Sequence, residues 1–342
     1  MIASPWIIDL ILAIIPYCGR AVKPREGWVS RRDYALIIVA YNGYAPIYLG
    51  EDEENVIIAM DGESKTEAIK RALALVDAPY VVLLDGDTVP GGDLRLAVQA
   101  LADSGADVAS VKVLPIPLRN SILERLQHVE YSIAMRARRW APWLVSGAMI
   151  VARTESMKRI LERHSGNFDG EDLEIGLLAK QMGMKVIHVD FPAYTEVPAS
   201  LKQLIKQRIR WFKGFARLSM KFWRLPALIP HSLYWWILFA LMTPLKILSL
   251  DASIIPLAAV YAIYLMVTIA AKPPKAIHVA LFPLYGLLQV IIVPIAAALS
   301  CARGLMKKLG SINLKSKPEE KPPKAPWPTT SRGARYAAWP KS

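Results

Sequence analysis

Three short groups of polar residues have side-chain types and a spacing that could do chemistry. The first is Asp85-Gly86-Asp87, in which two carboxylates flank a glycine directly after an apolar run. A Mg²⁺ or Mn²⁺ ion held by such oxygens would bridge the diphosphate of a nucleotide-sugar and stabilise the departing charge. A plain turn is the alternative, because Asp-x-Asp arises readily by chance. The preceding apolar run favours a metal site at Asp85 and Asp87.

The second group is the carboxylate pair Glu171-Asp172. It follows a loop-like run at 166–170 and precedes apolar residues at helical spacing, so both carboxylates are expected near the start of a helix. In a crevice, such a carboxylate is a general base that removes the proton from an acceptor hydroxyl attacking the anomeric carbon of a sugar. The alternative is an ordinary helix start, in which the acidic residues stabilise the helix dipole.

The third group is Gln207, Arg210 and Trp211, within an amphipathic stretch at 201–224. Apolar residues form one face of this stretch and Lys and Arg supply charge, as in a helix that lies in the lipid headgroup layer. An interfacial helix explains the many Arg and aromatic residues. It does not require a Gln, an Arg and a Trp at this spacing, so a binding role for them is a separate hypothesis.

The elements that must position these groups alternate between strands and helices. Three near-continuous apolar runs are typical of strands buried on both faces of a parallel sheet. They lie at 35–41, 55–61 and 80–85. Helical spacing at 64–76 behind an N-cap, Ser64, predicts a crossover helix, and a helix at 93–104 and a strand at 107–113 continue the alternation. The predicted class is α/β, Rossmann-like, with a mostly parallel sheet whose strand-end carboxylates converge on one crevice.

The chain of 342 residues is more apolar than a soluble enzyme needs, with 54% hydrophobic residues and a mean hydropathy of +0.28. Three apolar blocks, at 2–17, 228–271 and 277–302, carry this excess. We therefore expect an N-terminal transmembrane anchor and C-terminal transmembrane helices in a multi-pass protein of the cell membrane. Basic residues follow the first block, which predicts a cytosolic central domain. The number of later passes and the side of the tail stay open.

Most of the net charge of +13 lies in the last forty residues. Residues 303–342 hold ten Lys or Arg, two Glu and six Pro, which predicts a basic, disordered tail that contacts membrane lipid. No motif of a nucleic-acid-binding fold accompanies this charge, so nucleic acid is not an expected partner. The two cysteines, Cys18 and Cys301, are too few for a disulfide framework or a thiolate metal site. A homo-oligomer is left open.

Over about residues 35–215, the order and spacing of the motifs resemble the processive-type family 2 glycosyltransferases, the group that contains cellulose, chitin and hyaluronan synthases. The resemblance implies a GT-A fold and an inverting, single-displacement reaction that uses Mg²⁺ or Mn²⁺. Arg suits bidentate contact with a diphosphate, and an indole face suits contact with a sugar ring.

The resemblance also implies roles for individual residues. The catalytic base is Asp172, and the metal ligands are Asp85 and Asp87. The donor-binding residues are Tyr41, Asp61, Lys65, Asp85, Gln207 and Arg210, and the acceptor-binding residues are Gly147, Glu171 and Trp211. Ser146-Gly147-Ala148 resembles the small-residue segment that lines the family's acceptor site, and a close-packed strand is an equally good explanation.

The sequence thus predicts a membrane-bound glycosyltransferase that moves a sugar from a nucleotide-sugar, expected to be a UDP-sugar, to a glycan acceptor. Transfer to a polyisoprenyl phosphate or another lipid is the alternative within the same chemistry. A non-catalytic membrane scaffold is the alternative of another class, and the intact motif residues disfavour it. The expected domains are the anchor at 1–20, the GT-A domain at 30–198, the interface helix at 199–226, the transmembrane helices at 227–302 and the tail at 303–342.

Overall fold

The apolar run before Tyr41 forms a strand that is buried on both sides. In β1 (Tyr34–Val39), alternate residues such as Ile37 pack into one hydrophobic core, and their neighbours such as Leu36 pack into a second. Successive side chains of a strand point to opposite faces, so the two cores lie on the two sides of the sheet. The computed structural model describes residues 20–40, 48, 53–59, 64–116, 121–167 and 169–225, together with 262, 265–266, 281–282 and 284–286.

Within the described residues the sheet has seven strands in the order β2-β1-β3-β6-β5-β7-β4. Besides β1, the strands are β2 (Val56–Ala59), β3 (Tyr80–Asp85), β4 (Thr88–Pro90), β5 (Val108–Pro115), β6 (Met149–Arg153) and β7 (Val186–Thr195). Val39 is in register with both Ala59 and Asp85, so the carboxyl ends of β1, β2 and β3 form one edge. This edge holds the Asp85-Gly86-Asp87 motif.

The prediction of a mostly parallel sheet is wrong, because the sheet is mixed. Three strand pairs are parallel, whereas β6 runs antiparallel to both β3 and β5, and β4 runs antiparallel to β7. An apolar run shows that a strand is buried but not which way it runs. The reversal of β6 matters for the site: Met149 pairs with Leu84, so the segment just before β6 meets the edge where β3 ends.

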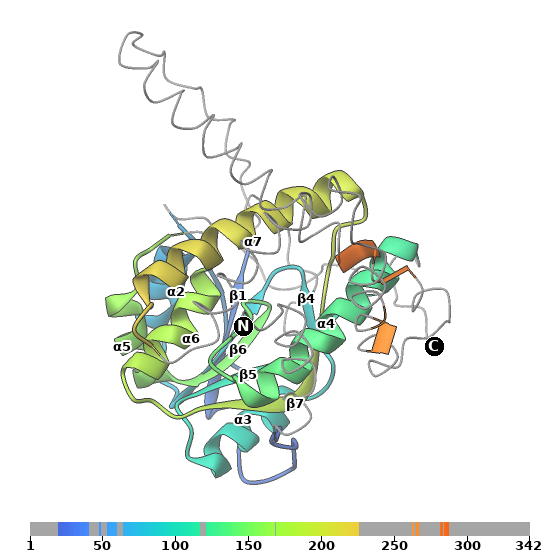
Figure 1. Cartoon of the computed structure of the whole chain (residues 1–342). Helices are drawn as coiled ribbons and strands as arrows, with labels where there is room; N and C mark the ends of the chain where they lie inside the picture. The colour runs from blue at the N-terminus through green and yellow to red at the C-terminus, as the bar shows by residue number, and fades with distance from the viewer. Residues whose placement is uncertain are drawn as a thin grey trace, which may run out of the picture. The chain divides into compact units, whose positions relative to one another are not determined.

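Six described helices cover the sheet (Figure 1). They are α2 (Lys65–Leu73), α3 (Leu94–Ser104), α4 (Ile122–Trp140), α5 (Thr154–Arg163), α6 (Glu171–Gln181) and α7 (Leu201–Lys221). Apolar residues of α2, α5, α6 and α7 share one core, and those of α3 and α4 share the other. Side chains before α2, α4 and α7 accept hydrogen bonds from the first turn, which fixes where these helices begin.

Several predicted elements are confirmed. The three apolar runs are β1, β2 and β3, and the helix predicted behind Ser64 is α2, whose cap accepts a hydrogen bond from the Glu67 amide. The helix at 93–104 is α3, and the strand at 107–113 is β5. α6 begins at Glu171 as expected. The segment Ser146-Gly147-Ala148 is not a strand but the turn that leads into β6.

The membrane segments expected from the sequence lie outside the described residues, apart from isolated helical positions between 262 and 286. The disordered tail and both cysteines lie outside them too. Among the residues that are described, no helix combines the length and the apolar character that crossing a bilayer requires.

Two close approaches at glycines hold α6 in place. At Gly176, an added Cβ would lie 1.9 Å from the backbone oxygen of Trp143, so α6 packs directly on the turn that precedes β6. At Gly214 of α7, an added Cβ would lie 2.7 Å from the backbone of Asp169, just before α6. These contacts bring the start of α6, the turn before β6 and the middle of α7 together.

We predict that Gly176→Ala destabilises the fold by about 2 kcal/mol, because the new methyl group meets a backbone carbonyl that cannot rotate away. The gain in helix propensity of at most about 1 kcal/mol is smaller. Thermal or chemical unfolding of the full chain in detergent measures the change. The control is Gly92→Ala, where the added Cβ would have its nearest neighbour at 3.6 Å and a change within about 0.5 kcal/mol is expected. Equal stability of the two variants would contradict the packing described.

Candidate active site

One ammonium group joins three elements at the edge where β3 ends. Lys65, the first residue of α2, places Nζ 2.6 Å from Oδ1 of Asp85 and 2.9 Å from Oε1 of Glu171. Asp85 is the last residue of β3 and Glu171 is the first of α6. Burial disfavours the charge on Lys65, but the two carboxylates outweigh burial and hold its pKa above the ordinary value. Lys65 is therefore a fixed cation between two acidic residues that are far apart in the sequence.

Asp85 and Asp87 present two carboxylates at this edge. Burial raises the pKa of Asp85 to about 7 against the opposing effect of Lys65, and the nearby Asp87 carboxylate adds to the rise. Asp87 is exposed, and its Oδ1 accepts hydrogen bonds of 3.2 Å from the hydroxyls of Thr88 and Thr195. Thr195 reaches Asp87 because β4 pairs with β7.

This pair suits a divalent cation that brings ligands of its own. Mg²⁺ is commonly held by one or two carboxylates, with phosphate oxygens and water completing its shell. Within the described part of the chain, no group of three or more His, Cys, Asp or Glu side chains could hold a metal by protein ligands alone. Two carboxylates at one edge match the partial set of protein ligands that Mg²⁺ commonly has.

Asp172, the second residue of α6, contacts the turn before β6. Its Oδ2 accepts a hydrogen bond of 2.7 Å from the amide of Gly147, and its Oδ1 accepts one of 2.8 Å from the amide of Leu173. A Cβ at position 147 would lie 3.2 Å from the Asp172 Cβ and 3.3 Å from Lys65 Nζ, so a residue without a side chain fits best here. Burial, and then the charge of Glu171, raise the pKa of Asp172.

The neighbouring carboxylate, Glu171, has the opposite character. Burial favours its neutral form, but the Lys65 ammonium outweighs burial and lowers the pKa of Glu171. The charge of Arg210 on α7 contributes to the same lowering, so Arg210 is close enough to act at this edge. Two adjacent carboxyl groups thus differ in basicity, and Asp172 is the better proton acceptor.

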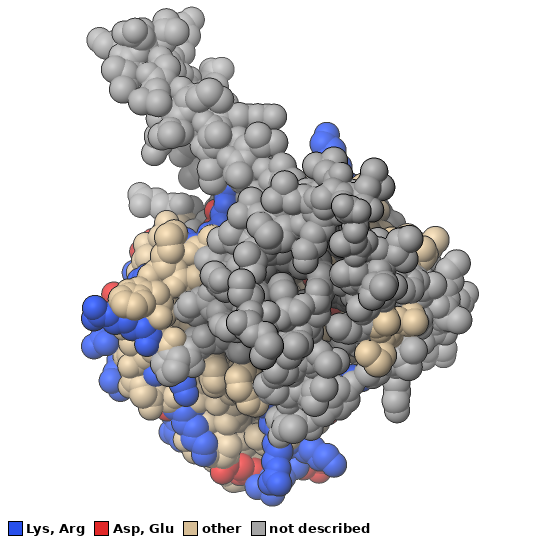
Figure 2. Space-filling model, viewed as in Figure 1, with Lys and Arg blue, Asp and Glu red and all other residues tan. Residues whose placement is uncertain are grey.

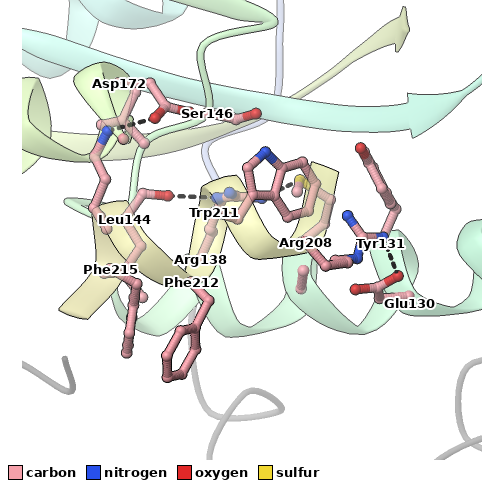
Figure 3. A pocket seen from close by; sticks show the side chains of 15 residues that line it. Glu130, Tyr131, Arg138, Leu144, Ser146, Asp172, Arg208, Trp211, Phe212 and Phe215 are labelled. Carbon is pink, nitrogen blue, oxygen red and sulfur yellow. Dashed lines mark hydrogen bonds and ion pairs between the residues drawn. The ribbon is translucent and has the colours of Figure 1, made fainter. Parts of the chain in front are cut away.

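Asp172 also lines a cavity of about 460 Å³ between α4, α7 and the turn before β6 (Figure 3). Ser146, Trp211 and Phe215 are among the residues that line it. The Trp211 ring lies 6.5 Å from the Tyr131 ring, centroid to centroid, and the Arg208 guanidinium lies over it at 4.1 Å. Asp172 and Trp211, for which the family resemblance implies catalysis and acceptor binding, therefore line one cavity.

Arg208, which the sequence interpretation did not single out, packs against the Trp211 ring. It is buried and forms an ion pair of 2.7 Å with Glu130 of α4. The hydroxyl of Tyr285 donates a hydrogen bond of 2.6 Å to the same carboxylate, and the Gln207 amide oxygen accepts one of 2.8 Å from Arg208. Gln207 thus contacts the neighbouring Arg208 through its amide oxygen, and its predicted contact with the donor diphosphate stays a prediction.

Comparison with known proteins identifies the family. Residues 80–297, more than half of the chain, match the family model described as glycosyl transferase family group 2. The chain belongs to this family. It is a glycosyltransferase. An N-acetylglucosaminyltransferase of Bradyrhizobium diazoefficiens is 25% identical over 194 residues, which are 52% of this chain and 40% of that protein. The chain thus spans less than half the length of that curated relative.

A solved structure supports the fold. The mannosyltransferase PcManGT from Pyrobaculum calidifontis, solved in complex with GDP-Man and Mn²⁺, is similar with a TM-score of 0.55 at 16% sequence identity. The similarity covers 86% of this chain and 95% of that structure. The glycosyltransferase described here therefore has a GT-A-like α/β fold built on a mixed sheet.

The structure brings most of the predicted residues to one region of the glycosyltransferase. Lys65, Asp85, Gly147, Glu171 and Asp172 are linked by the contacts described above, and Trp211 joins them through the cavity. Two predicted donor-binding residues, Tyr41 and Asp61, lie outside the described residues.

The sequence interpretation missed the charged residues of α4 that line the cavity, Glu130 and Arg138. No motif marks them. The one available signal is that both lie within a helix whose other cavity residues include Ala134 and Met135. A charged side chain among apolar neighbours usually has a charged partner or binds a ligand.

Proposed function

We propose that this glycosyltransferase moves a sugar from a nucleotide-sugar to a hydroxyl group of an acceptor held in the Trp211 cavity, with inversion at the anomeric carbon. One observation carries the proposal. Asp172, whose pKa is raised, lines the cavity, while its neighbour Glu171 shares the Lys65 ammonium with Asp85. The donor edge and the acceptor cavity therefore meet at the start of α6.

The proposed step follows from this arrangement. The acceptor oxygen forms a bond to the anomeric carbon on the face opposite the diphosphate, and its proton passes to the carboxylate of Asp172. The bond from the anomeric carbon to the diphosphate oxygen breaks, and the nucleoside diphosphate leaves with the bonding electrons. Because attack and departure occur on opposite faces, the configuration inverts. Burial suits Asp172 to this role, since a raised pKa makes it a stronger base.

At the donor edge, Asp85 and Asp87 would hold Mg²⁺ or Mn²⁺, which supplies charge stabilisation for the departing diphosphate when bound. The use of Mn²⁺ with a nucleotide-sugar in the Pyrobaculum mannosyltransferase structure supports this assignment. Arg210 is proposed to contact the diphosphate, because its charge already acts on Glu171 and a guanidinium suits phosphate oxygens. We expect a UDP-sugar as donor, as the motif resemblance implies.

The aromatic side chains that line the cavity, Trp211 and Tyr131, favour a glycan as the acceptor. The exposed indole of Trp211 offers a flat face to a sugar ring, and the motif order resembles that of the processive polysaccharide synthases. Transfer to a lipid acceptor is the second candidate. It is favoured by the apolar part of the cavity wall, which includes Leu144, Leu173 and Phe212.

We further propose that the enzyme works at the cell membrane as a multi-pass protein with a cytosolic catalytic domain. Its apolar blocks support this, and so do the large apolar side chains Leu201, Met220 and Trp223, which are exposed on and just after α7. Among the described residues visible in Figure 2, Lys and Arg are more prominent than Asp and Glu, as contact with anionic lipid would favour. A non-catalytic scaffold is set aside, because the chain belongs to a family of enzymes.

Replacing the base tests the mechanism. We predict that Asp172→Asn lowers sugar transfer by about 10² to 10⁴-fold while nucleotide-sugar binding is retained. In the unchanged enzyme, Asp172 must be ionised, so transfer should decline as the pH falls through a pKa above the ordinary aspartate value of about 4. The measurement is release of nucleoside diphosphate and labelled product by the full chain in detergent, with UDP- and GDP-sugars screened as donors. Transfer by Asp172→Asn at the unchanged rate would refute the assignment.

The metal assignment makes a separate prediction. Asp87→Ala should weaken donor binding more than about tenfold in the presence of Mn²⁺ and leave metal-free binding unchanged, because one of two carboxylate ligands is lost. Equilibrium binding of a nucleotide-sugar with and without Mn²⁺ measures this. Asp77→Ala is a matched control, since Asp77 is an exposed carboxylate before the opposite end of β3. If Asp87→Ala keeps the metal dependence of the parent enzyme, the site lies elsewhere.

A further inference from the structure

The cavity beside Asp172 contains a second arginine whose charge is not used by the proposed reaction. Arg138, in the last turn of α4, lines the cavity with Asp172 and Trp211 (Figure 3). Its Nε donates a hydrogen bond to the backbone oxygen of Leu144, and its Nη1 lies 3.5 Å from the sulfur of Met135. Both partners are uncharged.

The two cavity arginines differ in how their charges are balanced. Arg208 has its counter-ion, Glu130, at 2.7 Å and a further contact with the Tyr285 hydroxyl. Arg138 forms no ion pair within 4.0 Å with any carboxylate in the described part of the chain. Burial lowers the pKa of Arg138, and the charge of Asp172 only partly opposes this effect. A guanidinium stays charged even so, and a partly buried charge without a nearby counter-ion is unfavourable.

Asp172 forms no ion pair with Arg138 among the contacts of the described residues. Its two oxygens accept hydrogen bonds from the amides of Gly147 and Leu173. Asp172 and Arg138 therefore lie on the same cavity without direct contact, and the space next to Arg138 is open to a ligand. Apolar side chains such as Leu144, Phe212 and Phe215 form much of the remaining wall.

From this arrangement we infer that the acceptor carries an anionic group, a carboxylate or a phosphate, which binds the guanidinium of Arg138 while the acceptor hydroxyl lies at Asp172. The inference rests on the proposed function, since it assigns the chemical class of acceptor to the same cavity. A guanidinium offers paired N–H donors to either anion, so the two sources share one chemistry. A neutral acceptor would not form an ion pair with Arg138. The site should therefore bind an anionic acceptor more tightly than a neutral one of similar structure.

The test compares three octyl compounds that differ in the head group: octyl glucuronide, octyl phosphate and octyl glucoside. The full chain is held in phosphatidylcholine nanodiscs, each compound is used below its critical micelle concentration, and binding to empty nanodiscs is subtracted. We expect octyl glucuronide or octyl phosphate to bind at least about tenfold more tightly than octyl glucoside, as a charge-assisted hydrogen bond supplies. The tighter of the two anionic compounds identifies the source of the charge.

Substitutions at neighbouring arginines assign the effect to one residue. Arg138→Gln should abolish the preference for the anionic compounds, whereas Arg139→Gln, which removes the same charge from a side chain paired with Asp190 at 3.6 Å, should keep it. If Arg138→Gln does not fold, Arg138→Lys keeps the charge and should retain part of the preference. Equal binding of the three compounds by the unchanged protein overturns the inference, and so does a preference that survives Arg138→Gln.

If Arg138 had only a structural role, through its hydrogen bond to Leu144, Arg138→Gln would weaken the binding of neutral and anionic compounds alike. Because the readout is binding and not turnover, it is independent of whether sugar is transferred. If the unchanged enzyme transferred no sugar, the proposed function would be overturned. If it bound anionic and neutral compounds equally, only the inference of an anionic acceptor would be overturned.

Discussion

The site depends on the ammonium of Lys65 lying between the carboxylates of Asp85 and Glu171. Four acidic residues, three of them partly buried, gather where β3 ends and α6 begins, and their mutual repulsion opposes folding. Lys65 offsets part of this repulsion and joins α2, β3 and α6 at one point. It also keeps Glu171 readily ionised, whereas burial makes Asp172 and Asp85 more basic against the opposing effect of Lys65.

The acceptor side is set by backbone packing and buried ion pairs on α7. Gly214 lets α7 approach the loop before α6, and Glu174 of α6 binds Lys221 and lies 3.7 Å from Arg217. With Glu130 and Arg208 linking α4 to the same helix, the position of Trp211 relative to Asp172 is fixed from several directions. A shift of α7 would separate the aromatic wall from the base, and placement errors of this kind slow catalysis strongly.

The sequence predicted the features that depend on local patterns. Apolar runs located β1, β2 and β3, the Ser64 cap located α2, and the position of Glu171-Asp172 at a helix start followed from spacing. It did not predict the direction of β6, because burial alone does not encode strand polarity. Nor did it predict the charges of Arg138 and Arg208 in the cavity, since their surroundings come from helices distant in the sequence.

The central claim is that the acidic edge and the aromatic cavity are two halves of one active site. A crystal structure of the full chain with Mn²⁺ and UDP, with the ion located by its anomalous scattering, tests it most directly. The account predicts Mn²⁺ between the carboxylates of Asp85 and Asp87, with the diphosphate end of UDP directed toward Asp172 and the cavity lined by Trp211. A nucleotide and ion bound away from these residues would contradict it.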